Sequence, residues 1–392
     1  MSFTANTGTE ETFLASVERI ADDVAAKWVD EVDREARFPH EAIDALREAQ
    51  ALSALVPHEL GGGGASIEDV ASACFTLGKR CGATAMVFAM HQIQVACIVR
   101  HRNGSDWFEQ YLRDLVVGQR LIASATSEVG TGGDMGRSVA AVETLDDATR
   151  SFEKQAPTVS YGGQADDLLT TLRRAPDADG GDQVAVLTHK EQVELEQTGT
   201  WDPFGMRGTC SPGFKIRASF APEQQLPGHF AAISGQTMVP VSHILWSHIW
   251  LGIATDAFDR ARSFVRAAAR QKPGEPLPAA VRLSHLMVEL SLLRGEVNSA
   301  LRDFEDDSTR EGEQVATVAR AVRYNNLKIA ASEQAPRVCQ GAMAVCGIVG
   351  FKNDTPFSVG RHLRDTMSAS LMVANERIHQ TNAALLLVAK DV

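Results

Sequence analysis

The spacing of apolar residues changes twice along the 392-residue chain, and this limits the folds that the chain can form. Up to about residue 118, apolar residues recur every three or four positions, as on one face of a helix. Residues 120–228 instead carry short apolar runs such as QVAVLTH, separated by Gly, Pro, Asp and Ser, which indicate strands. The helical spacing returns after residue 229. The sequence therefore predicts an α+β multidomain protein with a helical domain at 1–118, a β domain at 119–228 and a second helical domain at 229–392.

Two shorter segments carry local predictions. APDADGGDQ, residues 175–183, has the glycine and aspartate content of a tight turn between two strands. RDFEDDSTREGEQ, residues 302–314, is strongly charged, and we expect a solvated loop between two helices there.

The composition disfavours several classes of function. The chain has 38 Lys and Arg against 50 Asp and Glu, and the resulting charge of −12 disfavours a nucleic-acid partner. The amino terminus lacks a basic region followed by an apolar run, and no later stretch approaches about eighteen unbroken apolar residues. We therefore expect a cytoplasmic protein without a membrane partner. The six cysteines form no Cys-x-x-Cys pair and no His/Cys cluster at zinc spacing, so we predict no metal site.

Six motifs lie at the junctions of these regions: FPHEAIDALREAQALSALVPHELGGGG, TSEVGTGGD, EKQAPTVSYGGQADDLL, FGMRGTCSPGF, ARQKPGEPL and GRHLRDTM. Their order and approximate spacing, over about residues 38–380, resemble the acyl-CoA dehydrogenase superfamily. The resemblance implies an N-terminal α-helical domain, a β-barrel-like middle domain and a C-terminal four-helix bundle. It also implies FAD held between the last two domains, and a homotetramer or homodimer in which a neighbouring subunit touches the adenine end.

The resemblance further implies a flavoenzyme that oxidises an acyl thioester or a related compound between its α and β carbons and passes the electrons to a carrier. A flavin-dependent monooxygenase of the same fold is the first alternative; it uses oxygen and reduced FMN or FAD supplied by a reductase. A non-catalytic flavin-binding or structural homologue is the second alternative. The sequence leaves the substrate, the electron acceptor and the pathway open.

The segment TSEVGTGGD, which begins at Thr126, resembles a flavin-contacting segment of the family. Ser127 lies at the position of a threonine that contacts the flavin ring. Gly133 lies at the usual serine, so one hydrogen-bond donor is lost there. KQAPTVSYGG resembles the next flavin-contacting turn, with Thr158 at its threonine, and Ser160 lies where some monooxygenases of this fold use a hydroxyl to handle oxygen-derived intermediates. Ser160 is therefore an alternative catalytic residue as well as a predicted flavin contact.

Other positions depart from the family pattern or have two explanations. Ala156 replaces the usual tryptophan, and Tyr161 either fills that space or is a structural residue of the turn. ARQKPGEPL places Arg270 near the FAD pyrophosphate of an adjacent subunit, where a guanidinium suits phosphate oxygens, although it also fits a helix-terminal arginine in a polar loop. Gly347 matches a glycine turn of the family that approaches a phosphate, but a helix C-cap explains this glycine equally well.

The stretch RHLRDTMSASLMVANERI lacks the catalytic base that the resemblance leads us to expect. In the family, a carboxylate over the substrate removes a proton α to the thioester carbonyl. The position of the glutamate in the commonest subgroup falls on Val373, and Asn375 lies where a threonine contacts the flavin. The position used by a second subgroup falls on Ser242 and His243. We therefore expect Val373, Ser242 and His243 to lie at the substrate site without supplying a carboxylate.

Two residues are candidates to replace this base. Glu376 lies three residues beyond Val373, although a glutamate at a helix start more often interacts favourably with the helix dipole. His91, within AMHQIQ, is the alternative catalytic residue if the chain is a monooxygenase, and a packed histidine on an apolar helix face is the competing interpretation. Three possibilities stay open: a relocated base, a reaction that needs none, or no reaction.

Overall fold

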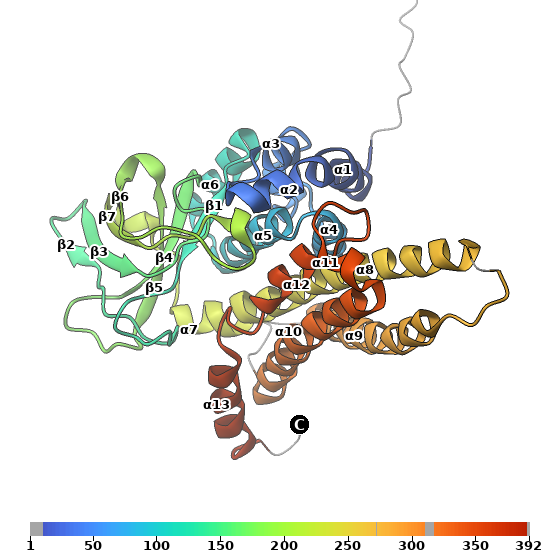
Figure 1. Cartoon of the computed structure of the whole chain (residues 1–392). Coiled ribbons are helices and arrows are strands. Elements are labelled where there is room, and N and C mark those ends of the chain that lie inside the picture. Colours follow the sequence, from blue (N-terminus) through green and yellow to red (C-terminus); the bar gives the residue numbers. More distant parts are fainter. Residues whose placement is uncertain (1–10, 272, 310–316, 390–392) are drawn as a thin grey trace, which may run out of the picture.

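The first part of the protein is a layer of helices (Figure 1), and the long helix of residues 82–101 within it is largely buried. The computed structural model describes residues 11–271, 273–309 and 317–389. The helices of this part are α1 (Phe13–Ile20), the π-helical turn η1 (Ala21–Ala25), α2 (Ala26–Glu35), α3 (His40–Glu48), α4 (Ile67–Arg80), α5 (Gly82–His101) and α6 (Asp106–Gly118), with 3₁₀ turns η2 (Ala51–Ser53) and η3 (His58–Leu60). By length and hydropathy, α5 could cross a membrane, but it is buried within the protein, as core helices are.

The start of α4 illustrates how the sequence sets these helices. The Ser66 hydroxyl accepts a hydrogen bond from the Asp69 backbone N–H, and the Asp69 carboxylate accepts one from the Ser66 N–H. This reciprocal cap satisfies two donors that a helix start leaves unpaired. The glycine run before it packs closely, since a Cβ at Gly62 would lie 2.2 Å from the Val56 carbonyl oxygen.

The middle part of the chain forms two small sheets. The strands are β1 (Ile122–Ala125), β2 (Glu143–Thr144), β3 (Arg150–Ala156), β4 (Asp167–Arg173), β5 (Gln183–His189), β6 (Val193–Gln197) and β7 (Phe214–Phe220), with 3₁₀ turns η4 (Lys190–Gln192), η5 (Arg207–Thr209) and η6 (Pro222–Gln224). One sheet has the order β1-β4-β5 and the other β2-β3-β7-β6. β1 runs parallel to β4, whereas β4 and β5 form an antiparallel hairpin around residues 175–183, which confirms the turn predicted there.

The last part of the chain is helical again. Its elements are α7 (Phe230–Ile233), the π-helical turn η7 (Ser234–Met238), α8 (Val239–Gln271), α9 (Pro278–Thr309), α10 (Val318–Cys346), α11 (Ile348–Phe351), α12 (Gly360–Met367) and α13 (Asn375–Leu386). The long helices α8, α9 and α10 pack against one another, and α8 also packs on α4. α13 extends away from the body in Figure 1, and the buried amide of Asn382 bonds it to Asn325 and Asn326 of α10.

The predicted order of a helical, a sheet-containing and a helical part is confirmed. The predicted domain limit at 118/119 lies at the end of α6, and the predicted limit at 228/229 lies just before the start of α7. Both limits stay predictions. The prediction of a loop at residues 302–314 was wrong for residues 302–309, which belong to α9. The rest of the predicted loop falls within 310–316, which lie outside the described residues. Charged residues every few positions fit the solvated end of a helix as well as a loop.

Candidate functional site

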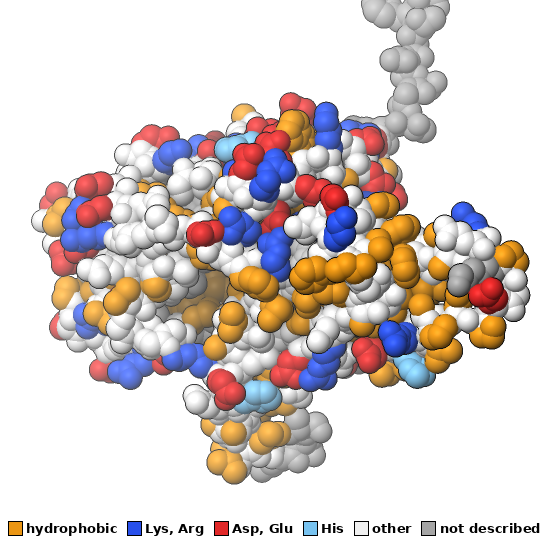
Figure 2. Space-filling view, viewed as in Figure 1, with side chains coloured by type: hydrophobic (Ala, Val, Ile, Leu, Met, Phe, Trp, Pro, Cys, Tyr) orange, Lys and Arg blue, Asp and Glu red, His pale blue; other side chains and the backbone are white. Residues whose placement is uncertain are grey.

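Two adjoining cavities form one cleft between the sheet-containing part and the C-terminal helices. The first cavity, of about 430 Å³, lies between α5, the loop after β1, the turn after β3, the start of α8 and the segment before α13. The second, of about 510 Å³, continues between the loop after β1 and helices α8, α10 and α13. Gly133, Asp134, Met135, Val373 and Arg377 line both cavities. Figure 2 shows the molecular surface hollowed between the sheet-containing part and α13.

The structure brings the predicted hydroxyl residues together in the first cavity. Thr126, Ser127, Thr158 and Ser160 all line it. The Ser127 hydroxyl donates to the Thr158 carbonyl oxygen at 2.7 Å and so joins the loop after β1 to the turn after β3. Ser160 accepts a hydrogen bond at 2.9 Å from the Ser211 hydroxyl. One wall of the cavity therefore carries several donors and acceptors.

The opposite wall of the first cavity is mainly apolar. It consists of side chains from α5, η7, α8 and the segment before α13, namely Met90, Ile93, Met238, Trp246, Leu371 and Met372. Ser242, predicted at the substrate site, lies on this wall at the start of α8. A cavity with one polar and one apolar wall suits a flat ring that has polar atoms along one edge.

The glycine-rich loop of the cleft is anchored at its base. The buried Glu128 carboxylate accepts hydrogen bonds from the backbone N–H groups of Val139 and Ala140, which closes residues 128–140 into a loop. The Lys154 Nζ lies 3.6 Å from Glu128. Burial lowers the pKa of Lys154 to about 8, and the nearby carboxylate opposes this shift. Because the base of the loop is fixed, its tip, with Gly132 and Gly133 at positive φ, stays at the cleft.

The segment before α13 has an unusual backbone. Val373 has a φ of +49°, a left-handed conformation that is strained for a β-branched residue. The Lys328 Nζ of α10 donates to the Val373 carbonyl oxygen at 2.8 Å and to the Asn375 side-chain oxygen at 2.7 Å. The Asn375 amide nitrogen donates to Ser332 at 3.1 Å. The Asn375 side chain, which the sequence placed at the flavin, therefore belongs to a hydrogen-bond network beside the cleft. This network fixes the left-handed backbone conformation of Val373.

Among the described residues, the cleft has no carboxylate placed to act as a base. Glu376 is exposed in the first turn of α13 and does not line either cavity, which fits the helix-dipole role rather than the catalytic one. Asp134 is the one carboxylate among the described residues that line the cleft. It is exposed, and its side chain accepts a hydrogen bond at 2.9 Å from the Gly136 N–H of its own loop.

The two candidate histidines are both poor bases. His91 lies outside the cleft: its Nε2 is 2.7 Å from the Leu52 carbonyl oxygen and its Nδ1 accepts from the Ile122 N–H at 3.0 Å. Burial lowers the pKa of His91 to about 4, so it is a neutral packed histidine. His243 lines the second cavity, where Nδ1 donates to the Tyr324 carbonyl oxygen at 3.0 Å and burial lowers the pKa to about 3.

The remaining predicted residues lie away from the cleft. Tyr161 is buried and donates to the Ile122 carbonyl oxygen at 3.0 Å, so it is structural and does not replace an aromatic wall. Gly347 ends α10, and its N–H bonds the Met343 carbonyl oxygen, as in a helix C-cap. Arg270 is exposed near the end of α8, and its predicted contact with a neighbouring subunit stays a prediction.

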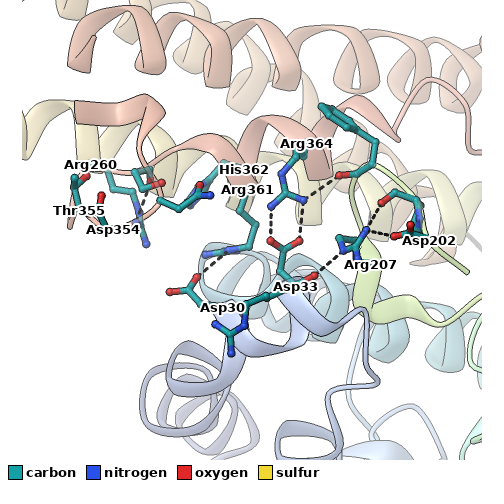
Figure 3. Close-up of a pocket in the computed structure, with 15 residues that line it drawn as sticks. Asp30, Asp33, Asp202, Arg207, Arg260, Asp354, Thr355, Arg361, His362 and Arg364 are labelled. Atoms are coloured by element: carbon teal, nitrogen blue, oxygen red, sulfur yellow. Dashed lines mark hydrogen bonds and ion pairs between the residues drawn. The ribbon is translucent and has the colours of Figure 1, made fainter. Parts of the chain in front are cut away.

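A separate cavity of about 750 Å³ lies between α2, residues 202–207 and α12, and shares no lining residue with the cleft. Two ion pairs join α12 to α2: Arg364 binds Asp33, and Arg361 approaches Asp30 at 3.7 Å (Figure 3). Arg207 binds Asp202 within its own segment. Because the first two pairs join α12 to α2, they hold the N-terminal and C-terminal helices together. The motif GRHLRDTM therefore has a structural role here.

Sequence reasoning missed Lys328 and Arg377, the latter of which lines both cavities from α13. The sequence carries a signal for Arg377, since a cation in the first turn of a helix opposes the helix dipole and needs another reason to be there. Lys328 carries no such signal, because its burial follows from packing between α10 and the segment before α13.

The fold combines a helical, a sheet-containing and a second helical part, with a cleft between the last two. Residues 7–119 match the acyl-CoA dehydrogenase N-terminal domain, and residues 237–382 match the acyl-CoA dehydrogenase C-terminal domain. The chain belongs to the acyl-CoA dehydrogenase family.

Curated relatives at low identity have different activities. The chain is 24% identical over 361 residues to the probable acyl-CoA dehydrogenase YngJ of Bacillus subtilis, covering 90% of each protein. It is 24% identical over 355 residues to the amino sugar nitrososynthase DnmZ of Streptomyces peucetius, covering 87% of this chain and 84% of the relative. The structure of FMN-bound TdsC from Paenibacillus sp. A11-2 superposes with a TM-score of 0.83 at 19% identity, covering 96% of this chain and 97% of TdsC.

The cleft fits the flavin that the family implies. Its polar wall offers hydroxyls at the edge of the cavity, its other wall offers apolar contact, and its glycine loop lets the backbone approach a ligand. Ser127, Thr158 and Ser160 are the residues that would hold the ring. The chain is thus a flavin-binding oxidoreductase by family, and the form of the flavin and the reaction are matters for proposal.

Proposed function

We propose that this protein is a flavin-dependent monooxygenase that uses reduced FMN or FAD and oxygen. The observation that carries the proposal is the absence of a suitably placed carboxylate among the described residues that line the cleft. Removing a proton α to a thioester carbonyl needs such a group within hydrogen-bond reach of the substrate. Oxygen insertion does not need this proton transfer. The sequence had favoured dehydrogenation, and the geometry of the cleft leads us to prefer its alternative.

The chain's own residues would bind and shield the reactants. Ser127 and Thr158 hold the two loops of the polar wall together, and Met90 and Trp246 help to exclude water from the opposite wall. A bound reduced flavin supplies two electrons, so that one oxygen atom of O₂ enters the substrate and the other leaves as water. A separate reductase would provide the reduced flavin. Dehydrogenation of an acyl thioester is the second candidate, supported by the similarity to YngJ.

Two measurements on the FMN-loaded protein distinguish these reactions. Under anaerobic conditions, acyl-CoA thioesters of several chain lengths are titrated while the absorbance of oxidised flavin is followed. The protein-bound flavin is then reduced chemically and mixed with oxygen, and its reoxidation is compared with that of free flavin. We expect no bleaching by thioesters and a reoxidation rate that the protein changes. Bleaching by any of the thioesters would contradict the proposal.

A double variant links this activity to the predicted ring contacts. Ser127→Ala with Thr158→Ala removes one of the hydrogen bonds between the two loops and two hydroxyls of the polar wall. Flavin retention should weaken by about tenfold or more, because each lost hydrogen bond contributes about 0.5–1.5 kcal/mol. An unchanged flavin content would show that the ring lies elsewhere.

We also infer that copies of this chain associate through α9 and α13. Val281, Val288 and Leu292 lie exposed along α9, and Leu386 and Leu387 are exposed at the end of α13. Exposed apolar surface of this kind is typical of subunit interfaces. Sedimentation as a dimer or tetramer is expected, and a monomer at micromolar concentration would contradict the inference.

A further inference from the structure

The guanidinium of Arg377 lies where the two cavities of the cleft meet. It is half-buried, and among the described residues its side chain has neither a hydrogen-bond partner nor an ion-pair partner. A guanidinium carries five N–H donors in a planar fork and stays charged at all ordinary pH values. A charged group in a partly closed cleft with none of these donors used indicates a missing acceptor.

The position of Arg377 in α13 strengthens this argument. The residue lies in the first turn of a 12-residue helix, where the backbone N–H groups already make the local potential positive. Its neighbour Glu376 is exposed and forms no ion pair with it among the described residues. Two positive contributions at one place favour a bound anion.

The glycine loop leaves room for this side chain. A Cβ at Gly132 would lie 3.3 Å from the Arg377 Nη2, and one at Gly133 would lie 3.4 Å from its Nε. Both glycines have positive φ, so side chains are disfavoured there for a second reason. Gly133 stands where the family has a serine, which the sequence indicated as the loss of one donor. In the structure, the donors of Arg377 lie at this place instead.

We propose that Arg377 binds an anionic oxygen group, a phosphate or carboxylate, of the ligand at this junction. Planar pairing of a guanidinium with two such oxygens is the strongest hydrogen-bonded arrangement available to the side chain. The anion belongs either to the flavin, as its phosphate, or to the substrate. The first source rests on the proposed flavin function, whereas the second does not.

The test compares wild type with Arg377→Met and, as a matched control, Arg337→Met. Arg337 is an exposed arginine of α10 within 3.7 Å of Glu333. Riboflavin and FMN, which differ by the phosphate, are titrated against each protein by flavin fluorescence. Inorganic phosphate and pyrophosphate are titrated separately, with the thermal unfolding midpoint Tm of the protein as the readout. Far-ultraviolet circular dichroism checks that each variant is folded.

Each source of the anion gives a different pattern. If the flavin supplies it, wild type and Arg337→Met bind FMN about tenfold or more tightly than riboflavin, and Arg377→Met loses this difference. If the substrate supplies it, FMN and riboflavin bind equally, while phosphate or pyrophosphate raises the Tm of wild type and not of Arg377→Met. Gly133→Ser, which keeps the arginine but crowds it, should shift the affected measurement in the same direction.

The proposal is overturned if Arg377→Met matches wild type in both titrations. It is equally overturned if Arg337→Met produces the same losses as Arg377→Met, because the effect would then reflect net charge. If no flavin binds to any of the proteins, the proposed function fails, and the phosphate titrations still decide the role of Arg377.

Discussion

Lys328 is a buried base whose protonation state links the stability of this protein to pH. Its Nζ is fully buried and donates to Val373 and Asn375 beside the cleft. Burial lowers the pKa of Lys328 to about 7, and the nearby Glu333 opposes the shift. In the unfolded chain the pKa of a lysine is about 10.4. Between these two values the unfolded chain holds a proton that the folded chain has released.

The sign and size of the effect follow from this difference. Unfolding takes up a proton at pH 7–10, so the free energy of unfolding increases as the pH increases through this range. Integration between pH 7 and pH 9 gives a gain of about 2 kcal/mol from this one residue. A neutral amine retains two N–H donors, so both hydrogen bonds persist when the proton leaves.

The assay is urea unfolding followed by tryptophan fluorescence at pH 7, 8 and 9 for wild type and Lys328→Met. Groups that titrate in both proteins contribute equally, so the difference between the two pH profiles isolates Lys328. We expect a rising profile for wild type and a flatter one for the variant. Parallel profiles would refute the reasoning, because they would show that Lys328 keeps its proton in the folded protein.

Further predictions concern the segment before α13. Val373→Gly should be more stable than Val373→Ala by about 1 kcal/mol, because both lose the two methyl groups of valine and only alanine keeps a Cβ, which is strained at a φ of +49°. At the exposed helical position Val288, the alanine variant should instead be more stable than the glycine variant by about 1 kcal/mol. Urea unfolding of the four variants measures both differences. The same order of stability at both positions would contradict the left-handed backbone at Val373. Glu376→Gln should leave flavin content and oxygen reactivity unchanged, since Glu376 does not line the cleft, and loss of either in absorption measurements would restore it as a catalytic candidate.

The sequence predicted the fold, and it named residues that the structure groups along one wall of the first cavity, because both depend on local patterns. The change of apolar spacing identified the three parts, and two short motifs identified Ser127 and Thr158, which the structure brings into hydrogen-bond contact. Each of these motifs lies on a single loop. Because the fold of the family sets where that loop lies, recognising the motif is enough to place its residues in the cleft.

The residues that the sequence did not place depend on contacts between distant segments. Arg377 reaches Gly133 over more than half of the chain, and Lys328 is buried by a turn that lies 45 residues further along. The spacing of apolar residues shows that His91 lies on a helix, but it does not show which side of α5 faces the cleft. The structure shows that both ring nitrogens bond to the backbone of other segments.

Helix α13 has a ligand-facing residue at one end and an exposed apolar residue at the other, and this arrangement can make ligand binding depend on protein concentration. This 12-residue helix carries Arg377 in its first turn, and its last residue, Leu386, is exposed. A partner that covers the apolar end would restrict the helix and so change the affinity of the cleft for its ligand. Thermodynamic linkage requires the reverse as well, so the ligand would change the affinity of the partner by the same factor. Diluting the protein would then alter ligand binding even though the chemistry of the cleft is unchanged.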